Sequence, residues 1–474
     1  MKSVSSLAIL LTAATAGMAI ANDFGAEVQM LLMSKSKQLM GVNSPLESAA
    51  PKSAEEGFRT ADLKPEAVIQ LAGGLKGEFV TREIADSADM IAFYPLNKPT
   101  HMIVCIEGDR EELEGGKLNP GVQRVSMADG KVETIVRGTN SCDGIRTTPW
   151  NTILFTEEAD DGGAYELLEP LKATEISITD RAMGETTDTV QVRKHPALPN
   201  MAWEGLTILP SGIVYAGDEL RPGTSYPNTD GGAIFKFVPS KTMTATSIST
   251  LDESPFNAGA THALQVSCQP TAQFGQGCEV GDARWLLVDA AKARVTADVA
   301  GATGYYRPED LHQDMTFKGE GVKFCWTNTG NAKIGNYGEV LCAIDKAPEL
   351  ADGKMSTRVW RFLAGNAEMN QPDNLEIHPK SGLVYVIEDN PNGDIWSCLP
   401  DGADLDEMSD GCLRVASVTD SSAEPTGFIF APDGETAYLN IQHSNDKAMA
   451  KIDGYGTDDM IKITGFGPVE FAQR

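Results

Sequence analysis

Residues 382–396 read GLVYVIEDNPNGDIW, the clearest copy of a pattern that runs through much of the chain. A glycine turn opens an apolar run that ends in an acid, Glu388. A short loop then leads to a second apolar run that begins at Gly393. Short apolar runs bounded by Gly, Pro, Asn and Asp are typical of β-hairpins. The stretch therefore predicts two antiparallel strands joined by a short loop.

The same hairpin pattern recurs along the chain. Copies lie at 149–167, 210–237, 321–341 and 432–452, and a looser copy spans 91–125. Successive copies mostly begin about 50–60 residues apart, which is the spacing of propeller blades. We therefore predict an all-β protein with the fold of a six-bladed β-propeller. The interval from 210 to 321 is of double length, so it holds either a large insertion or a seventh blade around 285–288.

The N-terminal part has a different sequence pattern. Residues 1–21 place Lys2 before an apolar stretch and end in the small-x-small sequence Ala19-Ile20-Ala21, which predicts a secretory signal peptide and a periplasmic or extracellular protein. Residues 22–76 are expected to form a short helix, from its spacing over 26–40, and an extended strap. Residues 77–474 are expected to form the propeller domain, with insertions around 240–300.

Charge limits the partners. The 474 residues contain 39 Lys and Arg against 67 Asp and Glu, a formal net charge of −28. Nucleic acid as a stable partner and attachment to an anionic membrane are both disfavoured, because each depends on basic side chains. We expect a monomer that acts on small molecules.

Eight cysteines fit an exported chain, in which disulfides are stable. The last six form local couples separated by 10, 17 and 14 residues: Cys268 with Cys278, Cys325 with Cys342, and Cys398 with Cys412. Cys105 and Cys142 remain. They either pair with each other or leave one sulfur as a thiolate ligand.

Acids recur at one position of the repeat. Glu157, Asp218 and Glu388 each end the first apolar strand of their copies. No nucleophile elbow, phosphate-binding glycine loop or zinc-type histidine spacing occurs. Equivalent strand ends converge on the centre of a propeller, so these carboxylates are candidates for a site that holds hard cations such as Ca²⁺ or Fe³⁺.

Further candidates stand out by their context, and each lies where a blade begins or ends. They are Glu204 in an apolar run, Arg307 and Glu309 in Arg-Pro-Glu-Asp, Asp373 in Pro-Asp-Asn-Leu, Asn440 in Asn-Ile-Gln, and Cys142 in Asn-Ser-Cys-Asp-Gly.

These motifs, taken in order, resemble those of the PhoX-type alkaline phosphatases, a family of secreted bacterial propellers. The resemblance covers roughly residues 77–453. It includes Thr148-Pro149-Trp150 leading to Glu157-Glu158, and Pro432-Asp433-Gly434 near the end. Asp143 and Ile145-Arg146 interrupt the glycines that follow the cysteine in the family, and Trp203 stands where the family has histidine.

The resemblance implies hydrolysis of phosphomonoesters at a cluster of Fe³⁺ and Ca²⁺ in the channel. It implies Cys142, Glu204 and Glu309 as iron ligands, and Glu157 and Asp373 as calcium ligands. Arg307 would hold the phosphate. To these we add Glu388 as a metal ligand, and we expect Arg307, Glu309 and Asn440 to be the catalytic residues. The alternatives are a non-catalytic ligand-binding propeller and a propeller hydrolase of another ester, a phosphodiester or a lactone.

Overall fold

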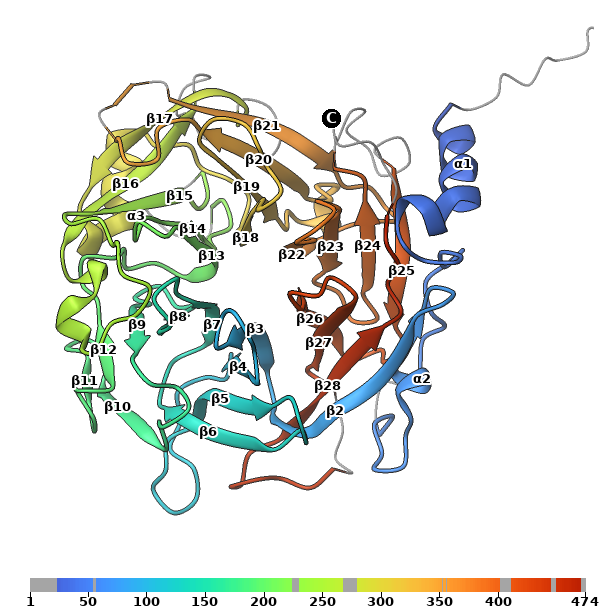
Figure 1. The fold of residues 1–474 in the computed structure, drawn as a ribbon, viewed down its shortest axis with the longest axis horizontal. Coiled ribbons are helices and arrows are strands. Elements are labelled where there is room, and N and C mark those ends of the chain that lie inside the picture. Colours follow the sequence, from blue (N-terminus) through green and yellow to red (C-terminus); the bar gives the residue numbers. More distant parts are fainter. Residues whose placement is uncertain are drawn as a thin grey trace, which may run out of the picture.

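The computed structural model describes residues 24–53, 57–223, 230–266, 279–351, 353–354, 356–400, 411–444 and 449–469. In this part of the chain, antiparallel sheets stand side by side around a common centre in a propeller-like arrangement (Figure 1). Their order around the centre follows the sequence. The prediction of an all-β, propeller-like fold is confirmed. The predicted signal peptide lies outside the described residues.

Two sheets open the ring. The first pairs β3 (Ala88–Tyr94), β4 (His101–Ile106), β5 (Pro120–Ser126) and β6 (Val132–Arg137), with β10 (Ile176–Asp180) and β11 (Glu185–Thr186) at the outer edge. The second pairs β7 (Cys142–Thr147), β8 (Ile153–Glu157), β9 (Ala164–Leu167) and β12 (Val192–Lys194). The 149–167 hairpin predicted from the sequence is β8 and β9.

A nine-stranded sheet follows. It contains β13 (Trp203–Ile208), β14 (Val214–Asp218), β15 (Ile234–Pro239) and β16 (Gly259–Val266), then β17 (Gly281–Val288), then β21 (Thr357–Ala364), β20 (Glu339–Asp345), β19 (Val322–Asn328) and β18 (Pro308–Gln313). Strand β17 pairs with both β16 and β21. The segment that the sequence left open as an insertion or a further blade is therefore a strand that joins two four-stranded units. Short helices accompany this sheet: η1 (Leu251–Glu253), η2 (Pro255–Asn257), η3 (Ala290–Lys292), α3 (Ala293–Ala300) and η4 (Ala332–Ile334).

N-terminal strands complete the last two sheets. One sheet pairs β22 (Pro372–Ile377), β23 (Val384–Glu388), β24 (Asp394–Cys398), β25 (Cys412–Val418) and β1 (Ile69–Leu71). The other pairs β26 (Glu424–Phe430), β27 (Thr436–Gln442), β28 (Thr457–Thr464) and β2 (Lys76–Ala85). Helices α1 (Phe24–Leu39) and α2 (Pro65–Val68) precede them, and Arg59 of the strap binds Asp459 of β28 at 2.7 Å. These contacts fasten the two ends of the chain together.

Apolar side chains fill the space between neighbouring sheets. Between the first two sheets, Ile103, Val122, Phe155 and Tyr165 belong to one buried cluster. Alternate residues of a strand point to opposite faces, so each sheet supplies apolar groups to two such clusters. The centre of the ring is left to the innermost strands β3, β7, β13, β18, β22 and β26, which neighbour one another in a closed circle.

Two of the predicted cysteine couples are disulfides. Cys325 on β19 is bonded to Cys342 on β20, and Cys398 on β24 to Cys412 on β25. Cys268 and Cys278 lie outside the described residues. Among the helices that the structure describes, none is long and apolar enough to cross a membrane.

Candidate metal centre

The innermost strands share one feature at their beginning. In β3, β7, β13, β18 and β22 the second residue is an acid, and all five acids are buried: Asp89, Asp143, Glu204, Glu309 and Asp373. Directly after each acid the pairing with the next strand shifts its register. A bulge of this kind re-aims side chains. The repeated bulge therefore presents a carboxylate to the centre from several sheets.

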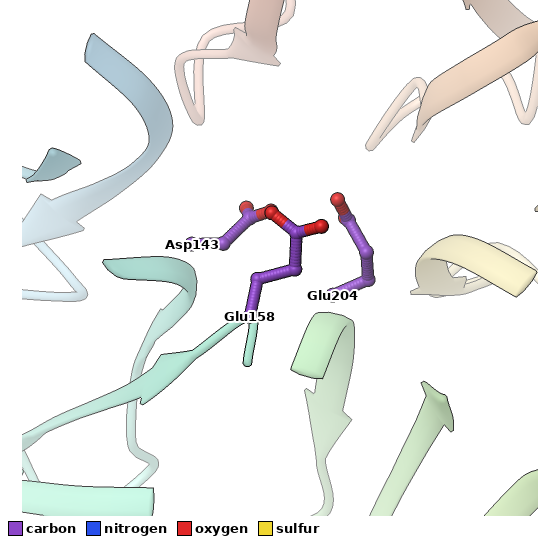
Figure 2. A group of neighbouring side chains, drawn as sticks. All are labelled: Asp143, Glu158 and Glu204. Carbon is purple, nitrogen blue, oxygen red and sulfur yellow. The ribbon is translucent and has the colours of Figure 1, made fainter. Parts of the chain in front are cut away.

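The first carboxylate group consists of Asp143, Glu158 and Glu204. One oxygen atom of each lies within 4.8 Å of the others, and Figure 2 shows the three side chains pointing toward one another. Glu158 follows β8 directly, so the group joins the ends of three strands from two sheets.

The second carboxylate group consists of Glu204, Glu309 and Asp373, again with one oxygen of each within 4.8 Å of the others. All three side chains are buried. Glu204 belongs to both groups. The arrangement is therefore two adjoining carboxylate groups that meet at Glu204.

Several oxygens of these groups are buried without a hydrogen-bond partner among the described residues. They are both carboxylate oxygens of Asp143, Oε2 of Glu204 and Oε2 of Glu309. Burial raises the pKa of Asp143 to about 8. Burial, with the Asp143 and Glu309 carboxylates nearby, raises the pKa of Glu204 well above its ordinary value.

The groups therefore need compensating positive charge. Oxygen-rich donor sets suit hard cations such as Ca²⁺. The carboxylate oxygens without partners therefore fit the hard cations that the sequence predicted.

Arg307 is the cation closest to these groups. Its backbone has a φ of 62°, and its Nη1 lies 2.9 Å from Oε1 of Glu309 and 2.6 Å from Oδ2 of Asp389. Its Nε donates to Glu219. These carboxylates outweigh burial and raise the pKa of Arg307, so the guanidinium stays charged. Nη2 has no partner among the described residues.

Asn440 lies on β27 and is fully buried. Its Nδ2 donates to the backbone carbonyl of Asp89 at 2.6 Å, and its Oδ1 has no partner among the described residues. The amide therefore fixes the backbone beneath one of the central acids.

Glu157 and Glu388 are not brought to the carboxylate groups, contrary to their prediction as metal ligands. Glu157 binds Arg181 at 2.7 Å and accepts the backbone N–H of Asn140. Glu388 accepts the N–H groups of Asn370 and Asp394. Strand-end acids of this repeat point into the blade and hold neighbouring backbone.

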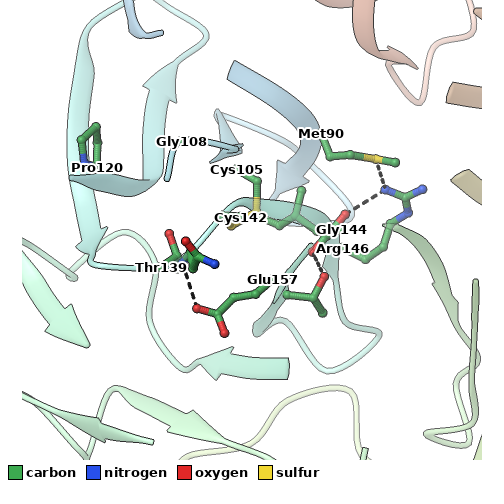
Figure 3. Close-up of a disulfide and its surroundings, with 12 residues drawn as sticks. Met90, Cys105, Gly108, Pro120, Thr139, Cys142, Gly144, Arg146 and Glu157 are labelled. Atoms are coloured by element: carbon green, nitrogen blue, oxygen red, sulfur yellow. Dashed lines mark hydrogen bonds between the residues drawn. A yellow bond between two sulfur atoms is a disulfide. The ribbon is translucent and has the colours of Figure 1, made fainter. Parts of the chain in front are cut away.

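The structure corrects the prediction that Cys142 is a thiolate ligand. Its sulfur is bonded to that of Cys105 (Figure 3). A cysteine binds a metal ion through its thiolate, and a cysteine in a disulfide cannot form a thiolate. The paired alternative that the sequence left open is the one found.

Sequence reasoning missed Asp143 and Glu158. A signal was present, because the predicted acids belong to double acids: Glu157-Glu158, Asp218-Glu219 and Glu388-Asp389. In each pair the first acid ends the strand, and the second follows it. Side chains alternate along an extended chain, so the second acid faces the opposite way. A one-residue shift from Glu157 would have found Glu158.

An all-β, propeller-like fold in which buried carboxylates meet at the centre defines a propeller protein with a candidate cation site. Residues 112–445 match the model of the alkaline phosphatase PhoX family, and the chain belongs to that family. It is therefore a phosphoric ester hydrolase. No curated protein matches the chain.

A solved structure shares the fold. That of Pseudomonas fluorescens PhoX in complex with vanadate, a transition state analogue, superposes with a TM-score of 0.59 at 16% identity. The match covers 88% of this chain and 99% of that chain. A luciferin-regenerating enzyme (TM-score 0.45, 10% identity, 84% and 98% covered) and the PQQ-bound aldose sugar dehydrogenase of Streptomyces coelicolor (0.43, 12%, 83% and 99%) are less similar.

Proposed function

We propose that this chain is an exported, metal-dependent phosphoesterase that hydrolyses small phosphomonoesters at the two carboxylate groups that meet at Glu204. One observation carries the proposal. Buried carboxylate oxygens without partners converge from several sheets beside a charged guanidinium, in a member of the PhoX family. Ca²⁺ and Fe³⁺ are the proposed cations, and Glu204, Glu309 and Asp373 are proposed to hold them.

Cations held by these carboxylates would supply positive charge to the oxygens of a phosphate ester and would favour an oxygen nucleophile. The acids by themselves repel a phosphate. The net charge of −28 disfavours the approach of an anion. The chain's contribution is therefore to hold positive charge at the site where the phosphate would bind.

Arg307 is proposed to bind and orient the phosphate. Glu219 and Asp389 hold Nε and Nη1 of the guanidinium, so its plane is fixed before a substrate arrives. Nη2 is left to donate to a phosphate oxygen, a contact that a planar guanidinium makes well. Glu309 belongs to the second carboxylate group and also contacts the guanidinium, so it is proposed to set the separation between the two.

Asn440 is proposed as a positioning residue. Its hydrogen bond to the carbonyl of Asp89 fixes the start of β3, where the Asp89 carboxylate enters the centre. This role differs from direct contact with a substrate.

Three further points are proposed. Counting the nine-stranded sheet as two blades gives the six blades predicted from the sequence. Residues 22–76 are proposed as an N-terminal helix and strap, whose strand β1 completes a propeller sheet, and residues 77–474 as the propeller domain. Export by the signal peptide 1–21 is supported by the disulfides of the described residues, since disulfides persist outside the cytoplasm.

The test is hydrolysis of p-nitrophenyl phosphate at alkaline pH by metal-replete protein, with metal analysis of the same sample. Wild type is expected to turn over, and Glu309→Gln is expected to lose most of the rate. Bis(p-nitrophenyl) phosphate and a lactone serve as competing substrates. Preference for either one contradicts the monoester assignment. No turnover of any ester contradicts the phosphoesterase assignment.

A further inference from the structure

Cys142 and Asp143 are consecutive residues that face opposite environments. Cys142 opens β7 and is fully buried in the apolar cluster between the first two sheets, where it is bonded to Cys105 of β4. Asp143, next in the strand, joins Glu158 and Glu204 at the centre. Strand β7 therefore directs the Cys142 sulfur into the apolar cluster and the Asp143 carboxylate to the centre of the propeller.

The approach of β7 to β13 is as close as the backbone permits. A Cβ atom on Gly144 would overlap the carbonyl oxygen of Glu204. Glycine at this position therefore lets the two strand beginnings meet. This contact places the carboxylate of Asp143 beside that of Glu204.

Glu158 is fixed through its backbone. Its N–H donates to the carbonyl of Ser141 at 2.7 Å, and Glu158 forms a β-bridge with Ala202. These contacts tie Glu158 to the residues just before β7 and just before β13. The backbone that carries the third carboxylate is therefore held from both sides before any ligand binds.

The spacing of the three carboxylates suits a hard cation. Their nearest oxygens are no more than 4.8 Å apart, and this upper limit is about twice the Ca²⁺–O distance of 2.3–2.6 Å. Asp143 is 1% exposed, and neither of its carboxylate oxygens has a partner among the described residues. A buried carboxylate without a donor stays protonated or takes a counter-charge, which a bound cation would supply.

We propose that Asp143, Glu158 and Glu204 form an oxygen-only cation site, in which Asp143 supplies the ligand from β7 while the Cys105–Cys142 disulfide keeps the sulfur out. The site takes a hard cation such as Ca²⁺ and shares Glu204 with the second carboxylate group. Its catalytic role rests on the proposed function. Its existence does not, and the test below reads binding without turnover.

The first measurement is calorimetric titration of chelator-stripped, oxidised full-length protein with Ca²⁺. Asp143→Asn is expected to lose one equivalent of bound Ca²⁺ or to bind it at least tenfold more weakly. Glu169→Gln is the matched control, because it removes one charge from an exposed ion pair with Lys172 and is expected to bind like wild type. Unchanged Ca²⁺ binding by Asp143→Asn overturns the proposal.

The second measurement asks whether sulfur takes part. A peptide map of the non-reduced protein is expected to contain the Cys105–Cys142 cross-link, and titration with Cd²⁺ is expected to give no thiolate charge-transfer absorbance that depends on Cys142. A free Cys142 thiol, or a Cd²⁺ or Fe³⁺ band that Cys142→Ser abolishes, overturns the proposal. Both results are independent of ester hydrolysis, so they separate this inference from the proposed function.

Discussion

Glu157 and Glu158 are consecutive residues at the end of β8, and their carboxylates point to opposite sides of that strand. Glu157 lies inside the blade, where its Oε1 is 2.7 Å from Nε of Arg181. Glu158 lies at the centre of the propeller with Asp143 and Glu204. Two consecutive residues therefore have different roles: Glu157 is a structural acid, and Glu158 is a proposed ligand.

Glu157→Gln is expected to destabilise the protein by about 3 kcal/mol, because removing one partner of a buried ion pair leaves the other charge unpaired. Urea unfolding of chelator-stripped protein measures the loss. Ca²⁺ binding is expected to stay unchanged. The double variant Glu157→Gln/Arg181→Met is expected to recover part of the stability. A stable Glu157→Gln that binds less Ca²⁺ contradicts the assignment.

Glu158→Gln is expected to behave in the opposite way. The side chain has no protein cation as a partner among the described residues, so the stripped variant unfolds at the same urea concentration as wild type. Its Ca²⁺ affinity falls roughly tenfold or more, because the number of charged ligands sets affinity. Titration calorimetry measures this fall. Equal loss of stability in Glu157→Gln and Glu158→Gln would remove the distinction.

Glu204→Gln is expected to weaken both cation positions together, because Glu204 belongs to both carboxylate groups. Asp373→Asn, by contrast, affects only the second group. Metal content after dialysis against a Ca²⁺ buffer distinguishes the two variants. If Glu204→Gln lost only as much metal as Asp373→Asn, the two groups would not share a ligand.

Glu388 predicts a pH effect on stability. Burial and the Asp394 carboxylate raise the pKa of Glu388 to about 8. The folded protein therefore favours the protonated acid. The stability that this acid contributes is full below about pH 4.5 and is lost as pH rises toward 8.

Glu388→Gln cannot ionise, so its free energy of unfolding relative to wild type is expected to rise between pH 5 and pH 9. The rise is about 1.4 kcal/mol for each unit by which the pKa is raised. Urea unfolding of both proteins across this range measures it. A constant difference at all pH values shows that Glu388 does not titrate in this way.

Arg307→Lys keeps the charge but loses the planar fork that Glu219 and Asp389 hold. The KM for p-nitrophenyl phosphate is expected to rise roughly tenfold, while Ca²⁺ binding stays as in wild type. An unchanged KM places the phosphate elsewhere.

Much of the fold could be predicted from local sequence. The 382–396 hairpin appears as β23 and β24, because alternating apolar residues and turn residues fix a strand pair locally. The couples Cys325–Cys342 and Cys398–Cys412 lie across such pairs and were found for the same reason. The role of β17 was out of reach, since its partner β21 lies about 70 residues later.

The site was predicted less well. Glu204, Glu309 and Asp373 were found because an acid at the start of an apolar strand is conspicuous. Glu157 lies one residue before Glu158, which belongs to the first carboxylate group, because the face of an acid at a strand end depends on whether the strand has already ended. The state of Cys142 depends on Cys105, which lies 37 residues earlier on a neighbouring sheet.

The central claim is that cations at the carboxylate groups around Glu204 enable hydrolysis of phosphomonoesters. The most direct test follows p-nitrophenyl phosphate hydrolysis and bound metal in the same samples, for protein stripped by a chelator and then reloaded stepwise with Ca²⁺ and Fe³⁺. Turnover is expected to be absent from stripped protein, to rise with bound metal, and to stay absent from Glu204→Gln. Full turnover by metal-free protein, or none by the metal-replete wild type, would contradict the account.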